Sequence, residues 1–308
     1  MPTPPPVPTA SRLSRRAPTL ALLAVTAVWG STFIVVKDAI GRMPVADFLT
    51  WRFAFAALVM LLVRPRALVT LGRRGRRIGV ALGLALGSGY LLQTLGLQTT
   101  SALVSGFLTG MVVVFTPLCA GLLLRERLGR TVWAAVALAT LGLALLSLHG
   151  FTLRGGELLT LGCAVAFALH IVGLGRWAGS FDAYGLAVVQ LLTTAALCAV
   201  IAVPHGLVVP PDGGVWAALA LTAIAATAVA FVVQTWAQAH LPPTRAAVVM
   251  SMEPVFSALC AVGIAHETLT PRMFLGALLL LGAMLLTEVG PGKPPVTEHL
   301  GDLARLEV

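Results

Sequence analysis

Long apolar stretches separated by short polar turns make up most of this chain. Many of the stretches are close to 20 residues long, the length of α-helix that crosses roughly 30 Å of bilayer hydrocarbon. The pattern therefore predicts an all-α integral membrane protein with ten transmembrane helices. We place them at approximately 17–36, 45–63, 78–97, 102–124, 131–148, 157–175, 183–203, 215–239, 244–265 and 272–288.

The composition agrees with this pattern. Of the 308 residues, 58% are hydrophobic and only 11% are charged, and the mean hydropathy is +0.93. Soluble domains carry roughly 25% charged residues. Such a low charge content indicates that lipid, and not water, surrounds most of the surface.

The formal charge of +9 does not indicate a nucleic-acid partner. The basic residues stand in short turns between apolar runs, without the interleaved aromatics that stack on bases. With a cytoplasmic N-terminus, sixteen of the 21 Lys and Arg residues fall on the cytoplasmic side and five on the other. Because basic residues concentrate on the cytoplasmic side of bilayers, both termini are expected inside a cell (inner or plasma) membrane.

The two ends of the chain differ from its middle. Residues 1–16 are Pro-rich and then basic, and we expect them to form a disordered cytoplasmic lead-in. The apolar run that follows is too long for a typical signal core and lacks a clear cleavage site, so it is taken as an uncleaved first helix. Residues 289–308 turn polar and are expected to form a cytoplasmic tail.

The cysteines suggest neither a disulfide framework nor a metal site. Cys119, Cys163, Cys198 and Cys260 all lie inside apolar runs, where cysteine behaves as a small hydrophobic residue. No metal and no cofactor are expected.

The second half of the chain repeats the first at an offset of 141 residues. Gln93-Thr94 matches Gln234-Thr235, and the run from Met111 matches that from Met252. The repeat predicts two five-helix units, residues 17–148 and 157–288. Because five is odd, the units enter the membrane with opposite orientations, an arrangement that transporters use to place a binding site at the repeat interface.

Several short motifs, in this order and spacing, resemble the drug/metabolite transporter superfamily, in particular its ten-helix branch with two EamA-type domains. The matching segments are Trp29-Gly30-Ser31-Thr32-Phe33 with Lys37, Arg52-Phe53, Leu124-Arg125-Glu126-Arg127-Leu128, Glu253-Pro254 and His266-Glu267-Thr268-Leu269. The resemblance covers roughly residues 17–288. It implies export or exchange of small metabolites, often amino acids or drug-like amphiphiles, without ATP hydrolysis.

The chain departs from the family pattern at two positions. Pro117 does not stand at the position that matches Pro254, and His266 stands where a Gly is common. The sequence therefore does not predict that the two halves break their helices in the same way.

Paired amides are the first candidates for substrate binding. Gln93 and Gln234 stand in the middle of apolar spans at equivalent repeat positions. Helical spacing puts Tyr90 and Thr94 on the face of Gln93, and Gln238 on the face of Gln234. These groups either hydrogen-bond a polar substrate in a central cavity or join helices to one another.

Trp29 and its repeat mate His170 lie in the middle of the first and sixth spans. The indole either stacks on an apolar or aromatic part of a substrate or packs within the bundle. The imidazole either takes part in proton coupling or is a hydrogen-bonded structural residue.

Three further residues carry charge or break a helix. Glu253 lies inside the ninth span just before Pro254, where a missing backbone donor opens the helix to water. It is a candidate for proton coupling, or for a helix break. Arg52 is expected near the outer end of its helix, with a snorkelling stem, where it pairs with Asp47 or attracts an anionic group.

The leading hypothesis is thus a secondary transporter, an exporter of small amphipathic metabolites by alternating access at a central cavity. Its partners are a small-molecule substrate and the lipid bilayer; the oligomeric state is left open. No ATPase subunit is evident, and the chain has no G-x-x-x-x-G-K-[ST] loop. The alternative is a membrane-embedded enzyme acting on a lipid-soluble substrate, although no clustered catalytic groups support it.

Overall fold

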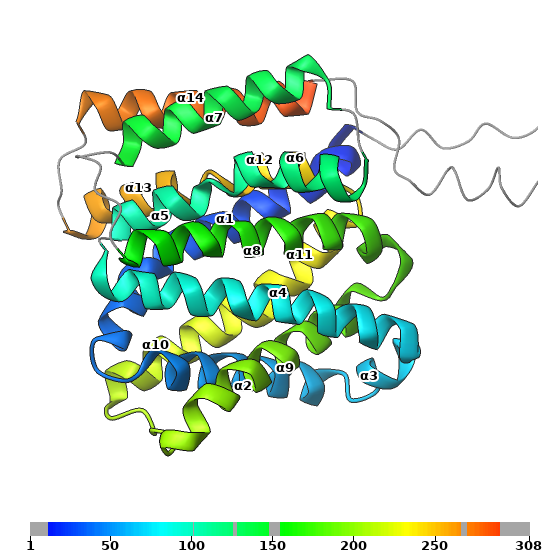
Figure 1. Cartoon of the computed structure of the whole chain (residues 1–308), viewed down its shortest axis with the longest axis vertical. Coiled ribbons are helices and arrows are strands. Elements are labelled where there is room, and N and C mark those ends of the chain that lie inside the picture. The colour runs from blue at the N-terminus through cyan, green and yellow to red at the C-terminus, as the bar shows by residue number, and fades with distance from the viewer. Residues whose placement is uncertain (1–11, 101, 126–127, 148–154, 266–269, 290–308) are drawn as a thin grey trace, which may run out of the picture.

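The computed structural model describes residues 12–100, 102–125, 128–147, 155–265 and 270–289. Every regular element in these ranges is a helix (Figure 1). They are α1 (Arg12–Ile40), α2 (Val45–Val63), α3 (Ala67–Thr70), α4 (Gly72–Thr99), α5 (Ala102–Gly110), α6 (Val112–Leu123), α7 (Arg130–Ser147), α8 (Gly155–Trp177), η1 (Ala178–Ser180), α9 (Ala183–Ala202), η2 (Val203–His205), α10 (Gly213–Ala223), η3 (Ile224–Val229), α11 (Ala230–Gln238), α12 (Pro243–Met250), α13 (Glu253–Ala265) and α14 (Pro271–Val289).

Seven of the described helical segments are long and apolar enough to cross a membrane. Two shorter apolar helical segments, Arg130–Leu145 and Phe274–Leu286, accompany them. The chain is therefore an all-helical, multi-pass membrane protein. The first helix starts at Arg12, earlier than the sequence analysis expected. Residues 1–11 and 290–308, together with Glu126, His266 and Glu267, lie outside the described residues.

Three of the predicted spans are not regular α-helices. The fourth is interrupted at Met111, between α5 and α6, and the ninth at Ser251–Met252, between α12 and α13. Pro254 stands in the first turn of α13, where a missing N–H breaks no bond within the helix. Met111 and Met252 are repeat mates, so the two breaks fall at equivalent positions although Pro117 lies inside α6.

The third irregular span is the eighth, which consists of α10, η3 and α11 in succession. Its middle segment, Ile224–Val229, is a π-helix. A π-helical turn inside an α-helix shifts the backbone bonding pattern and is frequent at functional sites. Here the N–H of Ala230 bonds to the carbonyl of Thr227.

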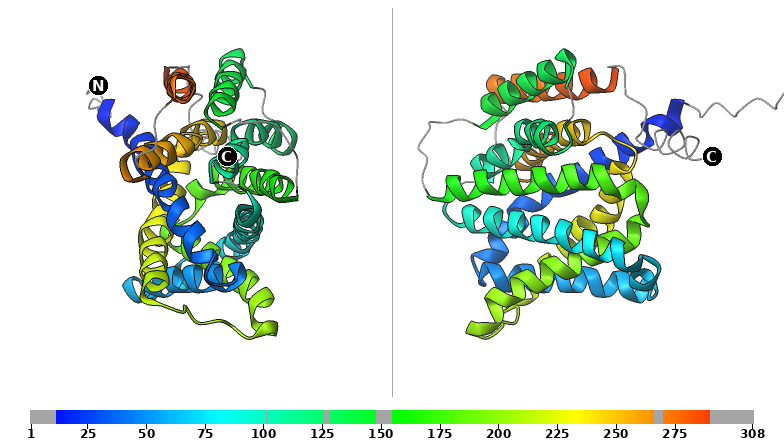
Figure 2. Two further views of the ribbon diagram at one scale, coloured as in Figure 1. Left: turned by 90° about the vertical axis from the view of Figure 1, so that its left-hand side faces the viewer. Right: turned by 45° about the vertical axis from the view of Figure 1, so that its right-hand side comes forward.

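The helices form a bundle in which segments far apart in sequence lie side by side (Figures 1 and 2). Helix α4 packs against α8 and α9, and α2 packs against α9 and α10. On the other side of the bundle α1 packs against α11, α12 and α13, while α5 and α6 pack against α8. Helices α7 and α14 lie together at the top of Figure 1.

Glycine permits some of these close approaches. A Cβ at Gly83 in α4 would lie 2.7 Å from the carbonyl oxygen of Gln190 in α9. A Cβ at Gly30 in α1 would lie 2.5 Å from the carbonyl oxygen of Glu253. Small residues that let backbones touch are typical of helix packing in membranes. The second contact sets α1 directly against the first residue of α13.

Candidate functional site

A cavity lies between the helices in the middle of the bundle. Inside it, about 70 Å³ is open to the centres of water molecules. One water needs roughly 10–15 Å³ by this measure, so the cavity has room for several waters or a small polar group. It is lined by Trp29, Thr32, Phe33, Val36, Arg52, Leu86, Tyr90, Gln93, Thr94, Leu97, Thr109, Gly110, Val112, Phe167, His170, Ile171, Phe231, Gln234, Met250 and Glu253.

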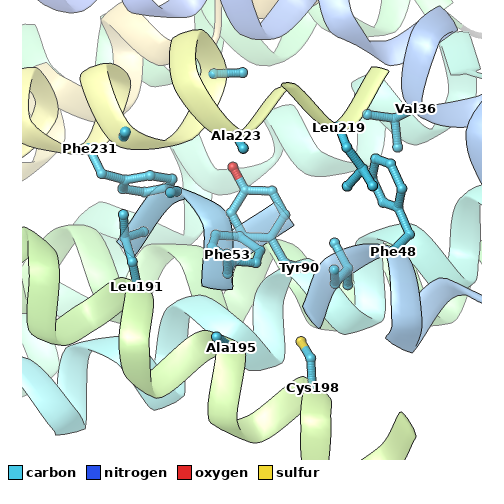
Figure 3. Close-up of a cluster of buried hydrophobic side chains, with 14 of the residues drawn as sticks. Val36, Phe48, Phe53, Tyr90, Leu191, Ala195, Cys198, Leu219, Ala223 and Phe231 are labelled. Carbon is cyan, nitrogen blue, oxygen red and sulfur yellow. The ribbon is translucent and has the colours of Figure 1, made fainter. Parts of the chain in front are cut away.

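Aromatic rings form much of the cavity wall. The Tyr90 ring lies edge-on to those of Phe53, Phe167 and Phe231, with centroids 5.0, 5.3 and 6.1 Å away. Figure 3 shows Tyr90 beside Phe53, with Phe231 to their left. The ring of Trp29 lies 5.6 Å from that of Phe231. Edge-to-face pairs at these distances hold the rings in fixed orientations.

The π-helical segment supplies a backbone acceptor to two side chains. The indole Nε1 of Trp29 donates to the carbonyl of Ala226 at 2.8 Å. The same carbonyl accepts from Arg52 Nη2 at 3.4 Å, and Arg52 Nε donates to Thr227 Oγ1 at 2.8 Å. This one segment thus holds two side chains, one from α1 and one from α2.

Arg52 does not lie where the sequence analysis expected it. Its side chain is buried, and the guanidinium lies 5.0 Å from the ring centroid of Tyr90, within cation–π range. Asp47 is not its partner, because that carboxylate accepts from the backbone N–H of Val208 at 2.6 Å. The π-helix offers Arg52 polar partners inside the bundle, so the side chain has no need to reach the membrane surface.

A relay of amides joins α8, α11 and the cavity. Gln238 Nε2 donates to the carbonyl of Ile171 at 3.1 Å, and Gln234 Nε2 donates to Gln238 Oε1 at 2.9 Å. The remaining oxygen, Gln234 Oε1, is buried and has no hydrogen-bond partner. Gln234 lines the cavity, whereas Gln238 lies behind it. Buried polar atoms without partners are few in folded proteins, and each calls for an explanation.

His170 is also fixed by an amide. Its Nε2 lies 2.6 Å from Gln190 Oε1, and Gln190 Nε2 donates to the carbonyl of Leu186 at 3.1 Å. Gln190 therefore presents an oxygen to the ring, and His170 Nε2 must carry the hydrogen. On the opposite wall Gln93 Nε2 donates to Thr109 Oγ1 at 3.1 Å.

Glu253 is the acidic group at the cavity. It is half-buried at the start of α13, and it lines the same cavity as Arg52. No ion pair within 4 Å joins the two among the described residues. Gly30 packs against its backbone, so the close contact between α1 and α13 fixes the backbone position of this residue.

The cavity runs toward the C-terminal ends of α1 and α4, where Val36 and Leu97 line it. At this end Lys37 Nζ donates to the carbonyl of Thr100 at 2.8 Å. Just beyond, Arg42 bonds to Asp38 and, at 2.8 Å, to Asp212.

Asp212 precedes α10 and caps it. A hydrogen bond from the Val215 backbone N–H, together with the charge of Arg42, lowers the pKa of the Asp212 carboxyl below its ordinary value of 3.8. The opposite end of the bundle has its own exposed ion pair, Arg64 with Asp182 at 3.0 Å. Ionic contacts thus join helices at both ends, with the cavity between them.

Most of the residues singled out from the sequence line this cavity. Eight do so: Trp29, Arg52, Tyr90, Gln93, Thr94, His170, Gln234 and Glu253. Two do not: Gln238 lies behind Gln234, and Pro254 follows Glu253 without lining the cavity. Among the described residues, no group of three His, Cys, Asp or Glu could hold a metal ion.

Sequence reasoning missed part of the wall. Phe231, Phe167 and Thr109 line the cavity, and Gln190 orients His170. One of them carried a signal, because Phe231 is the repeat mate of Tyr90. Nothing in the sequence pointed to the Ala226 carbonyl as an acceptor, because every residue has a backbone carbonyl whatever its side chain.

Comparison with known proteins identifies the family. A model of the EamA-like transporter family matches residues 17–148 and 154–289. An uncharacterized transporter of Archaeoglobus fulgidus is 34% identical over 271 residues, which are 88% of this chain and 85% of the relative. An uncharacterized inner membrane transporter of Escherichia coli, YedA, is 24% identical over 301 residues, or 92% of this chain and 95% of YedA.

The fold itself occurs among solved structures. One, titled only "Crystal structure of protein", superposes with a TM-score of 0.74 at 20% sequence identity. The match covers 90% of this chain and 97% of that one.

Proposed function

We propose that this chain, a membrane protein that belongs to the EamA-like transporter family, is a secondary transporter. Its proposed activity is the export of small amphipathic metabolites. Transport proceeds by alternating access at the central cavity. Amino acids and drug-like amphiphiles are the substrate classes that fit a cavity with both aromatic walls and polar groups. The following features support this proposal.

The first is the packing of ten spans, counted as five in each half and inverted relative to one another. If the halves are exchanged, the contact of α4 with α8 becomes that of α11 with α1, and both occur. The contact of α6 with α8 likewise becomes that of α13 with α1. The helix breaks at Met111 and Met252 also exchange. We therefore assign residues 17–148 and 157–288 to two repeats related by a pseudo-two-fold axis.

The second feature carries the proposal: residues at equivalent repeat positions line one cavity. Each pair is separated by the repeat offset of 141 residues. The pairs are Trp29 with His170, Tyr90 with Phe231, Gln93 with Gln234, Thr109 with Met250 and Val112 with Glu253. A cavity lined in this way lies on the axis between the repeats, where rocking of one half against the other alternates access.

Within the cavity the aromatic and amide groups bind substrate. Trp29 and Tyr90 contact its apolar part, and Gln93, Thr94, His170 and Gln234 face its polar part. Gln238 acts through Gln234, to which it is hydrogen-bonded. The earlier idea that Arg52 attracts an anionic group stays a prediction. Its bonds to Thr227 and Ala226 favour a bracing role instead.

The break between α12 and α13 is the proposed place for energy coupling. It leaves Glu253 at the start of a helix, beside the cavity and next to Pro254. Intramembrane carboxyl groups commonly serve in proton relays. Glu253 is our first choice for this role. His170 is the second choice for this role, because the hydrogen bond to Gln190 holds its ring in one orientation at the cavity.

For the orientation we propose cytoplasmic termini in the inner or plasma membrane, as the distribution of basic residues favours. The ends of α1 and α4 at Ile40 and Thr99 then lie on the outer side. In this orientation Val36 and Leu97 line the part of the cavity nearest the outer side.

Flux through purified protein in liposomes tests the proposal. Cells that express the chain are first challenged with a panel of toxic amino-acid analogues and dyes. A compound against which the chain protects is then labelled and used in proteoliposomes without ATP. We expect the compound to cross the bilayer chemically unchanged. Recovery of a converted product would indicate a membrane-embedded enzyme, and absence of flux would contradict the proposal.

A further inference from the structure

Arginines gather at the corner of the bundle where α2 ends and α4 begins. We call this set the arginine corner, and it consists of Arg64, Arg66, Arg73, Arg74, Arg76 and Arg77. All six residues are exposed. The short helix α3 lies between them in the chain, and Figure 1 shows it at the same end of the bundle as the start of α4.

The negative charge that would balance this corner is missing from the chain around it. No Asp or Glu occurs between Asp47 and Glu126 in the sequence. Asp182, just before α9, pairs with Arg64 at 3.0 Å, but no ion pair among the described residues involves the other five arginines. Basic side chains in the first turns of α4 also oppose the helix dipole. A partner from outside the chain can therefore supply the balancing charge.

The fold does not require this charge. Residues 205–218 stand at the equivalent repeat positions and connect α9 to α10 as residues 64–77 connect α2 to α4. They contain no Lys or Arg. The orientation of the chain does not require it either, because ten further basic residues on the proposed cytoplasmic side outnumber the five on the other.

Helix length places the arginine corner among the lipid headgroups. The largely apolar part of α4, residues 78–97, spans about 30 Å at 1.5 Å for each residue, which is the thickness of the bilayer hydrocarbon. Four of the arginines precede this part, within the first two turns of α4. Helix α2 ends at Val63, and Arg64 follows it directly. The arginines thus lie at the depth of the lipid phosphates.

Exposed apolar side chains stand next to the arginines. Leu62 and Val63, in the last turn of α2, are 71% and 73% exposed, and Val69 of α3 is 77% exposed. At the edge of the hydrocarbon such side chains contact acyl chains, because apolar surface is unfavourable in water. The corner therefore offers one part to a phosphate group and another to hydrocarbon, as an amphipathic molecule requires.

From this arrangement we propose that the arginine corner binds an anionic phospholipid. The arginines hold its phosphate and headgroup, and its acyl chains lie against Leu62, Val63 and Val69. The guanidinium suits phosphate because it donates two parallel hydrogen bonds. Basic clusters of this size beside a membrane helix are typical of anionic-lipid sites on the cytoplasmic leaflet, where the orientation proposed above places the corner. This binding is separate from the proposed transport and does not depend on it.

Native mass spectrometry of the purified full chain in detergent tests the proposal. The protein is titrated with an equimolar mixture of phosphatidylglycerol and phosphatidylcholine that carry the same acyl chains. We expect phosphatidylglycerol to be preferred at least roughly fivefold, the factor that one basic residue contributes near an anionic surface. The preference should fall as the salt rises from about 0.1 to about 1 M, because exposed charges are then screened. Equal binding of the two lipids, or a preference that salt does not change, overturns the proposal.

Variants assign the preference to the corner. R73Q/R77Q removes two arginines one turn apart on α4 and should lower the preference roughly fivefold or more. R125Q/R130Q is the matched control, because it removes two exposed arginines from the turn between α6 and α7. It should keep the preference of the wild type. An unchanged preference in R73Q/R77Q, or an equal loss in the control, contradicts the assignment. The salt titration of the wild type gives its answer whether or not the variants fold.

Two competitors distinguish a lipid from other anions. Glycerol 1-phosphate carries the phosphate without acyl chains, so it should not displace phosphatidylglycerol at millimolar concentration. Displacement by it would assign the corner to a soluble phosphate. A short DNA oligonucleotide at the concentration of the lipid should not displace it either. Displacement by DNA would assign the corner to nucleic acid, and either result overturns the lipid assignment.

Discussion

The indole Nε1 of Trp29 donates a hydrogen bond to the carbonyl of Ala226 at 2.8 Å, between residues 197 positions apart in the chain. Trp29 belongs to α1 and Ala226 to the π-helical part of the eighth span. The bond therefore links the two halves beside the cavity. It joins a ring that lines the cavity to an irregular backbone segment.

Removing the N–H of Trp29 tests this link. W29F keeps an aromatic ring but lacks the donor, and the Ala226 carbonyl retains only the longer bond from Arg52. We expect a loss of roughly 1 kcal/mol in the free energy of unfolding, a typical net value for one hydrogen bond. Thermal unfolding in detergent measures it. W133F, at an exposed tryptophan of α7, is the control. Equal melting temperatures for the two variants would contradict the assigned bond.

The bond between Arg52 and Thr227 is expected to couple the two side chains energetically. R52M removes the charge and T227V removes the hydroxyl with little change of shape. A double-mutant cycle should give a coupling of roughly 1–3 kcal/mol, the range for a hydrogen bond to a charged group. Stability of the four proteins in detergent is the measurement. Effects that simply add would show that Arg52 is held by its aromatic neighbours alone.

The paired amides are predicted to be essential for transport. Replacement of Gln93 and Gln234 together by Leu should abolish flux in proteoliposomes, because both polar walls of the cavity become apolar. Membrane insertion and yield should not change, since Leu is well tolerated in lipid-embedded helices. Q98L, which changes an exposed glutamine of α4, is the control. Full flux in the double variant would remove the amides from the mechanism.

Gly30 is predicted to tolerate no side chain. A Cβ there would lie 2.5 Å from the Glu253 carbonyl oxygen and 2.8 Å from the Cβ of Phe256, so α1 and α13 would have to separate. Overpacking of this kind destabilises by roughly 1–3 kcal/mol. G30A should therefore melt at a lower temperature than G162A. At Gly162 the nearest atom to a Cβ is a Leu92 methyl carbon at 3.5 Å. Equal melting temperatures would show that α1 does not touch the start of α13.

The ion cluster at the end of α10 predicts a pH dependence. The pKa of Asp212 is lowered in the folded chain, first by the Val215 N–H and then by Arg42. The stabilisation is thus present above the ordinary pKa of 3.8 and disappears as the pH falls through the lower, folded value. D212N should melt below the wild type near neutral pH, and the difference should vanish in strong acid. A difference that persists there would mean that the charge of Asp212 is not its source.

The hydrophobic pattern of the sequence predicted the helices well where local chemistry marks their ends. Helix α2 occupies 45–63 as predicted, because Pro44 precedes it and Pro65 follows it closely. The π-helical segment could not be predicted. Residues 224–229 contain neither Gly nor Pro, and the donors that reach this segment, Trp29 and Arg52, come from distant parts of the chain.

The sequence predicted those residues of the candidate site whose types are rare inside apolar helices. Glutamines inside apolar helices attract attention, and Gln93 and Gln234 do line the cavity. The position of Arg52 was not predictable, since its burial depends on the π-helix across the bundle. Which atom of the Gln238 amide faces Gln234 was not predictable either. It depends on the carbonyl of Ile171, which lies beside Gln238 as a tertiary contact.

The central claim is that two five-helix halves lie upside-down relative to one another around the cavity. Arg130 begins α7, and Arg272 is the second residue of the equivalent helix α14, so inversion places them on opposite sides of the membrane. Single cysteines at these two positions are labelled in intact cells with a membrane-impermeant maleimide, with the native four-cysteine chain as background. The account predicts labelling at 272 from outside and at 130 only after the membrane is opened. Labelling of both positions from the same side would contradict it.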